Sequence, residues 1–188
     1  IENRENVQTM KLTIIGSGTA VPEKDRVCSG YVLDTAGLHI LLDCGPGVVH
    51  GMARRNVDWR SITHLLLTHF HNDHIGDIPW LFFAWKHGMR PARSEPLLVI
   101  GPQGTGKRLE QMGELFGSHV AQPDFPLEVQ ELEGGQEIRM SDVARLTTYR
   151  TKHTDHSLAF RLEADGRSFC YTGDTAPDPE LGRFAQGV

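Results

Sequence analysis

The most informative stretch of this chain is THFHNDH, residues 68–74. It contains three of the ten histidines of the chain and one carboxylate, in the order H-x-H-x-D-H. Neutral imidazole nitrogen and carboxylate oxygen are together good ligands for zinc, iron or manganese. The stretch therefore predicts a metal site.

The spacing inside this stretch favours two neighbouring ions over one. Residues 65–67 are all leucine, so a buried strand is expected to end just before it. Residues two apart in an extended chain point the same way, so His69 and His71 can converge on one ion. Asp73 and His74 are adjacent and diverge, which lets them reach a second ion.

Two later residues complete the predicted site. His153 follows an expected strand at residues 144–149, and Asp174 follows another at residues 168–171. Ligands at strand ends are held by rigid elements, as a site for two ions requires. A carboxylate can bridge ions that lie roughly 3.5–4 Å apart, and Asp174 is the candidate for this role.

Length and composition suit one domain. The chain has 188 residues, of which 39% are hydrophobic and 23% charged, as in ordinary soluble globular proteins. No apolar run approaches the roughly 20 residues of a membrane span. The net charge of −5 argues against a generally basic nucleic-acid-binding protein. Three cysteines at unrelated spacings suit free thiols in the cytoplasm.

The domain is expected to begin at Met10. The run KLTII, which favours a β-strand, follows this methionine, and the residues before it are mostly polar. Residues 1–9 are therefore predicted to be a short extension or a cloning remnant, and residues 10–188 a single domain.

Strands are expected to outnumber helices. The expected strands are residues 11–15, 31–33, 39–42, 62–67, 97–100, 144–149, 158–162 and 168–171. The expected helices are residues 48–55, 75–87 and 107–116, with a short one within 177–184. Helices that interrupt a series of strands predict a layered α/β fold. The aromatic residues Trp80, Phe82, Phe83 and Trp85 are expected in the core, or else one or two of them line a substrate groove.

At this point the residues resemble a known family, the metallo-β-lactamase-fold hydrolases, and among them the ribonuclease Z and arylsulfatase-like phosphodiesterase branch. Six blocks in the right order carry the resemblance. They are Gly16-Ser17-Gly18 with Pro22 and Arg26, Leu42–Gly47, Thr68–His74, Gly101–Gly104, His153 with Ser157, and Gly173-Asp174-Thr175. The resemblance implies an αββα sandwich with two divalent metal ions, zinc or else manganese or iron, at one edge between the sheets.

The resemblance also implies a role for each site residue. His69, His71 and His153 would hold the first ion, Asp73 and His74 would hold the second, and Asp174 would bridge them. Asp43 would accept a hydrogen bond from a ligating histidine and so orient it. A hydroxide held by the metals would attack the substrate, and Asp73 would orient or deprotonate it.

The substrate class implied by the resemblance is a phosphodiester, and RNA is one possibility. One alternative is hydrolysis of an aryl ester, a sulfate ester or a lactone at the same site. A second alternative is a non-catalytic binding module whose metal site has decayed. We also expect a homodimer in the cytoplasm, without a membrane partner.

The chain departs from the family pattern in two ways, which limit what the resemblance implies about tRNA binding and the second metal ion. Only one expected strand pair separates His153 from Asp174, so there is no room for the long arm that grips tRNA in many ribonuclease Z proteins. No histidine follows His156, so the last histidine ligand of the family is missing. We therefore expect that the C-terminal part of the fold lies beyond Val188 and that the second metal site is incomplete in this chain.

Other motifs have two interpretations each. The segment Gly101–Lys107 nearly matches a phosphate-binding loop, or else it is a Gly-Pro turn that caps a helix. The N-terminus of that helix is also a candidate site for a substrate anion. His156 is either a proton donor beside the metals or an exposed loop residue. Lys86, Arg90 and Arg93 either bind phosphate or belong to a solvated charged loop.

Overall fold

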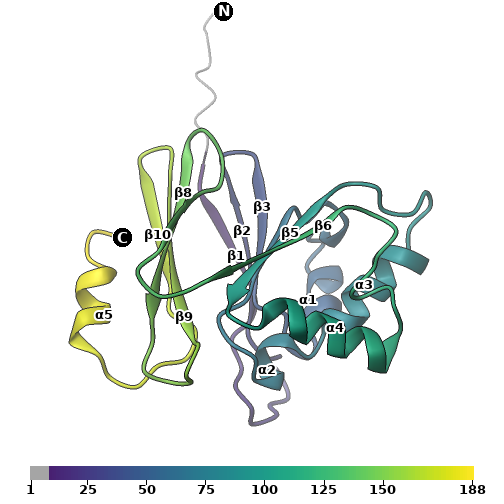
Figure 1. Ribbon diagram of the computed structural model, residues 1–188, viewed down its shortest axis with the longest axis horizontal. Helices are drawn as coiled ribbons and strands as arrows, with labels where there is room; N and C mark the ends of the chain where they lie inside the picture. The colour runs from purple at the N-terminus through teal and green to yellow at the C-terminus, as the bar shows by residue number, and fades with distance from the viewer. Residues whose placement is uncertain (1–8) are drawn as a thin grey trace, which may run out of the picture.

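Two β-sheets lie face to face, with several helices on the outer side of one and a single described helix on the outer side of the other (Figure 1). The computed structural model describes residues 9–188. The extension predicted at residues 1–9 therefore lies almost wholly outside the described residues. The predicted αββα sandwich is confirmed, because helices, two sheets and a further helix form four layers (Figure 1).

The first sheet has six strands in sequence order. They are β1 (Lys11–Gly16), β2 (Gly30–Thr35), β3 (Leu38–Leu42), β4 (His64–Leu66), β5 (Leu97–Pro102) and β6 (Leu127–Leu132). The first three strands pair antiparallel, and β3 to β6 pair parallel. The C-terminal ends of the parallel strands therefore meet at one edge of the sheet.

The second sheet is antiparallel and has four strands. In the order of the sheet they are β10 (Arg167–Tyr171), β9 (Leu158–Ala164), β8 (Ala144–Arg150) and β7 (Glu137–Arg139). Residues Asp165 and Gly166 turn β9 into β10, and both have the positive φ that a two-residue hairpin of this kind requires.

The helices divide unequally between the two outer faces (Figure 1). On the outer face of the six-stranded sheet lie α1 (Val48–Arg54), the 3₁₀ helix η1 (Trp59–Ser61), α2 (Asn72–Ile75), α3 (Ile78–His87) and α4 (Thr105–Phe116). On the four-stranded sheet lies α5 (Pro179–Phe184), where the Phe184 ring is 5.3 Å from that of Tyr149 on β8. No helix within residues 9–188 is both long and apolar enough to cross a membrane.

The buried strands of the first sheet contribute to two separate cores. On β4 and just after it, Leu65 and Leu67 pack toward the helices, whereas Leu66 packs toward the second sheet. This alternation follows from the period of two in a strand. Each fully buried leucine contributes about 1.5–3 kcal/mol. The end of β4 is therefore fixed from both faces just before the histidine-rich stretch.

The single helix predicted at residues 75–87 is in fact two helices. The break lies at Gly76 and Asp77, between α2 and α3. The carboxylate of Asp77 accepts a hydrogen bond from the N–H of Val49 in α1, at 3.0 Å. Pro79 lies in the first turn of α3, where a backbone N–H has no partner within the helix, so its missing N–H breaks no helical hydrogen bond. The break lets α2 take its own direction and carry part of the histidine-rich stretch.

The prediction that all four aromatic residues of this segment lie in the core was half wrong. Phe82 and Trp85 are buried, but Trp80 and Phe83 are 49% and 50% exposed. The buried pair shares the helix face of Ile78, because that face repeats every three to four residues.

Arg93 is neither solvated nor a phosphate-binding side chain. It is 4% exposed, and its guanidinium stacks on the rings of Trp85 and Phe125, at 4.6 and 5.0 Å. It donates hydrogen bonds to four backbone carbonyl groups, those of Arg60, Ile62, Glu95 and Pro96. Arg93 therefore ties the segment before β5 to the segment before β4.

This role predicts a large loss of stability in Arg93→Ala. The substitution leaves buried carbonyl groups without donors, and we expect the free energy of unfolding to fall by about 3 kcal/mol. Urea denaturation measures the change. Arg139→Ala is the control, because Arg139 makes an exposed ion pair with Asp142 and its loss should cost at most about 0.5 kcal/mol. Similar losses in the two variants would contradict the assignment.

Candidate metal centre

The histidine-rich stretch begins where β4 ends. Thr68 and His69 follow the buried strand, and His71 is the extended residue that precedes α2. Asp73 and His74 lie on α2 itself. The stretch thus changes from extended chain to helix between its second and third histidines, which turns its two halves in different directions.

Three imidazoles converge in the first group of side chains. Nε2 of His69 lies 3.1 Å from Nδ1 of His71, and Nε2 of His153 lies 3.0 Å from the same atom. His153 comes from the loop after β8, so the group joins the two sheets. Its three nitrogens lie within 4.8 Å of one another.

The second group consists of His69, His74 and Asp174, whose donor atoms also lie within 4.8 Å of one another. Nε2 of His74 is 3.4 Å from Oδ1 of Asp174 and 3.7 Å from Oδ2 of Asp73. The other oxygen of Asp174 lies 3.7 Å from Nε2 of His153. One oxygen of Asp174 therefore faces each group.

The donor set fits divalent ions. Nitrogen ligands that lie about 2.0–2.1 Å from one ion are about 3.0–3.4 Å from each other, and this is the spacing of the first group. Ring nitrogens that turn their lone pairs toward one another repel unless a cation or proton lies between them. The structure thus brings together all six residues predicted as ligands, whose roles stay a prediction.

Asp43 lies directly behind the two groups and is fully buried. Its Oδ1 accepts a hydrogen bond from the backbone N–H of Thr68, at 2.8 Å. Its Oδ2 accepts from the Thr68 hydroxyl at 2.9 Å, from Nδ1 of His74 at 2.6 Å and from the Tyr171 hydroxyl at 2.7 Å. Asp43 itself has a φ of 55°, in the left-handed region that Asp tolerates better than most residues.

The electrostatic environment of the two buried histidines differs. Burial, and next the charge of His74, lowers the pKa of His69 to about 4, so its imidazole is neutral at neutral pH. Burial also acts to lower the pKa of His74, but the hydrogen bond and charge of Asp43, with the charges of Asp174 and Asp73, raise it overall. Carboxylates that favour a proton there also favour a metal cation.

Two open pockets reach the centre, and Asp73 lines both. One has a volume of 390 Å³ and is lined by Asp73, His74 and Asp174 as well as by Tyr31 and other residues. The second has a volume of 410 Å³ and is lined by Asp73, Asn72 and the segment between β1 and β2. A substrate can therefore approach the centre from solvent.

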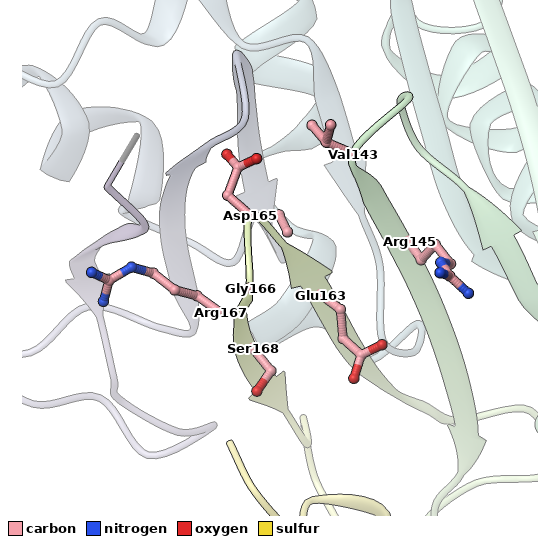
Figure 2. Close-up of a pocket in the computed structure, with 8 residues that line it drawn as sticks. Val143, Arg145, Glu163, Asp165, Gly166, Arg167 and Ser168 are labelled. Atoms are coloured by element: carbon pink, nitrogen blue, oxygen red, sulfur yellow. The ribbon is translucent and has the colours of Figure 1, made fainter. Parts of the chain in front are cut away.

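A third pocket lies away from the centre (Figure 2). It has a volume of 330 Å³ and surrounds the turn at Asp165 and Gly166, with Arg145 and Glu163 on the paired strands beside it (Figure 2). This turn joins the ends of β9 and β10 that point away from His153 and Asp174. The pocket is thus no part of the candidate site.

The segment Gly101–Lys107 agrees with the helix-capping interpretation. The hydroxyl of Thr105 donates to the carbonyl of Pro102 at 2.7 Å, and the N–H of Gly106 donates to Oε1 of Glu131 at 2.9 Å. A carboxylate of the chain thus occupies the N-terminus of α4. The alternatives of a nucleotide loop and of a substrate anion at this helix have no structural support.

His156, the other candidate near the metals, is exposed. It lines a pocket of 130 Å³ with Arg150 and Gln103. The structure places it outside both groups of donor atoms.

Sequence reasoning missed Tyr171 and Thr68, which both donate to Asp43. Tyr171 occupies the last position of a predicted strand, and Thr68 begins the quoted stretch. Tyr171 meets Asp43 from the other sheet, and Thr68 meets it from just beyond the neighbouring strand of the same sheet. Contacts between strands leave no local signal in the sequence, so neither was identified.

Comparisons with known proteins agree with this geometry. A family model described as Anti-Pycsar protein Apyc1 matches residues 10–186. Ribonuclease Z of Mycobacterium marinum is 34% identical, over 95% of this chain and 68% of that protein. Ribonuclease Z of Mycobacterium bovis is 32% identical over the same shares. The chain thus spans about two thirds of the length of these curated relatives.

Solved structures show the same fold. Human tRNase Z, short form, superposes with a TM-score of 0.75 at 25% identity, over 87% of this chain and 68% of that chain. The metallo-β-lactamase fold protein YhfI from Bacillus subtilis gives a TM-score of 0.74 at 23% identity, over 93% and 66%. Zn²⁺-bound PqqB from Methylobacterium extorquens gives 0.68 at 15% identity, over 93% and 69%.

These findings confirm the predicted superfamily and branch, and with them the class of metal-dependent hydrolase. The chain belongs to the Apyc1 family and lies, with its ribonuclease Z relatives, in the ribonuclease Z branch of the metallo-β-lactamase-fold hydrolases.

Proposed function

We propose that this protein hydrolyses phosphodiesters with two divalent metal ions bound between its sheets. The observation that carries the proposal is the placement of Asp174, whose two oxygens lie 3.4 Å from His74 and 3.7 Å from His153. A carboxylate in this position suits a bridge between neighbouring ions. Ribonuclease Z relatives support a phosphodiester as the bond that is cleaved.

In this proposal His69, His71 and His153 hold one ion. Asp73 and His74 would hold the other, and Asp174 would contribute to both. Water or another chain would complete the second site, because no histidine follows His156 to supply the last ligand of the family. Zinc suits this set of imidazole and carboxylate ligands, and manganese or iron would also be accepted. The ions would supply the Lewis acidity that polarises the phosphoryl group and makes a hydroxide nucleophile available at neutral pH.

Asp73 is the residue that we assign to proton transfer. Its side chain lies 3.7 Å from Nε2 of His74 and is 14% exposed. It also lines both open pockets that reach the centre. A carboxylate that faces both the ligands and the solvent-filled space is placed to orient a water molecule and to accept its proton.

Asp43 prepares two histidines to act as ligands. The proton on Nδ1 of His74 is donated to Asp43, which leaves Nε2 free to face Asp174. The Thr68 hydroxyl also donates to Asp43, so its oxygen accepts the Nδ1 proton of His69 at 3.0 Å. Nε2 of His69 is then free as well. One buried carboxylate thus fixes the tautomer of both rings.

The described chain between His153 and Asp174 consists of β9, β10 and their short connections. We therefore propose activity on a phosphodiester without assigning a role in tRNA processing. The homodimer and the cytoplasmic location stay predictions.

Activity on a small substrate tests this proposal. The full chain, supplied with zinc or manganese, should hydrolyse bis(p-nitrophenyl) phosphate faster than p-nitrophenyl acetate or p-nitrophenyl sulfate. A chelator should remove the activity, and added metal should restore it. Preference for the carboxyl or sulfate ester would favour the alternative ester hydrolase, and failure to bind metal would favour a decayed site.

The role of Asp73 gives a second prediction. Asp73→Ala should lower kcat for the phosphodiester by about 10²–10⁴-fold, because it removes the proposed proton acceptor. Asp142→Ala is the matched control, since that side chain is 96% exposed and pairs only with Arg139 among the described residues. Full activity in Asp73→Ala would exclude the assigned role.

The role of Asp43 gives a third prediction. In Asp43→Asn the amide can donate to Nδ1 of His74, which moves the ring proton to Nε2 and blocks the ligand. We expect the zinc affinity to fall about 10–100-fold, measured by competition with a chromophoric chelator. The tautomer of His74 can be read from ¹H–¹⁵N NMR of the metal-free protein.

Asp34→Asn is the control for this experiment, because Asp34 contacts Nδ1 of His39 away from the metal centre. Its zinc affinity should match that of the unaltered protein. If Asp43→Asn keeps both its zinc affinity and the Nδ1–H tautomer of His74, then Asp43 does not orient this ligand.

A further inference from the structure

A side-chain hydrogen bond joins the two sheets directly behind the metal centre. The hydroxyl of Tyr171 donates to Oδ2 of Asp43 at 2.7 Å. Tyr171 ends β10 of the four-stranded sheet, whereas Asp43 follows β3 of the six-stranded sheet. The two residues lie 128 positions apart in the chain.

The environment keeps Tyr171 in the form that can donate. Burial, and next the charge of Asp43, raises the pKa of the Tyr171 hydroxyl well above its usual range. The ring also packs 5.0 Å from that of Tyr31 on β2. Both contacts of this side chain therefore come from the six-stranded sheet, opposite the sheet to which Tyr171 belongs.

A second contact follows two residues later. Gly173 has a φ of 54° and lies against the side chain of Thr68, where an added Cβ would be 2.8 Å from the Thr68 Cβ. Thr68 is also bonded to Asp43 through its backbone and its hydroxyl. Tyr171 and Gly173 thus both attach the end of β10 to the segment that carries His69 and His74.

The segment that carries Asp174 is also hydrogen-bonded to the loop after β8. The hydroxyl of Thr151 donates to the carbonyl of Asp174 at 3.0 Å, and the N–H of Ala176 donates to the carbonyl of Lys152 at 2.9 Å. These bonds attach Asp174 to the segment that carries His153. They do not depend on Tyr171.

We propose that Tyr171 is a positioning residue, which holds Asp174 at the distance from His74 that the second metal ion requires. The proposal rests on the two-metal function proposed above. Asp174 has one attachment to the His153 side and another to the His74 side, and Tyr171 contributes to the second together with Gly173. Loss of the Tyr171 hydroxyl should therefore weaken the ion held by His74 more than the ion held by His69, His71 and His153.

The test is a metal titration of the full chain with zinc against a chromophoric chelator. The unaltered protein should bind two equivalents. In Tyr171→Phe one equivalent should bind about 10–100-fold more weakly, and the other should keep its affinity. Tyr149→Phe is the matched control, since Tyr149 also donates to a carboxylate, that of Asp178 at 2.9 Å, but away from the metals. It should bind both equivalents as the unaltered protein does.

A second variant tests the same attachment independently of the hydroxyl. Gly173→Ala places a methyl group against Thr68 and should also weaken one equivalent selectively. Two unchanged affinities in either folded variant would overturn the inference and leave the proposed function intact. An equal loss at both sites would show a structural role only and would also overturn it. Fewer than two equivalents in the unaltered protein would overturn the two-metal proposal and this inference with it.

Discussion

The arrangement of the metal centre depends on one buried carboxylate, that of Asp43. A carboxylate taken out of water costs several kcal/mol unless hydrogen bonds replace its hydration. Four hydrogen bonds to Asp43 offset this cost. The donors are the backbone and hydroxyl of Thr68, the His74 ring and the Tyr171 hydroxyl. These donors come from β10 and from the segment that follows β4, so the requirement to solvate one charge aligns both sheets at the centre.

The fold then determines where the ligands meet. Parallel strands β3 to β6 bring their C-terminal ends to one edge, and Asp43 and the histidine-rich stretch both leave the sheet there. The loop after β8 and the end of β10 reach the same edge from the second sheet and carry His153 and Asp174. The centre therefore lies between two rigid layers, which suits ligands that must keep a fixed separation.

Local patterns in the sequence predicted most of the fold and the residues of the candidate site. The histidine-rich stretch is visible because its donors are adjacent, and the central strands are visible because their apolar residues are continuous. Contacts between distant segments were not predictable, as with Tyr171 on Asp43. Strands β6 and β7 alternate apolar with charged or polar residues and were missed. Arg93 was misjudged because a buried guanidinium needs carbonyl partners that only the folded chain supplies.

The central claim is that two ions lie between the sheets and share Asp174. Anomalous diffraction at the zinc edge, from crystals of the zinc-loaded protein, tests it most directly. The account predicts two peaks about 3.5–4 Å apart, one beside His69, His71 and His153 and the other beside His74, with Asp174 in contact with both. A single peak, or two peaks of which only one contacts Asp174, would contradict it.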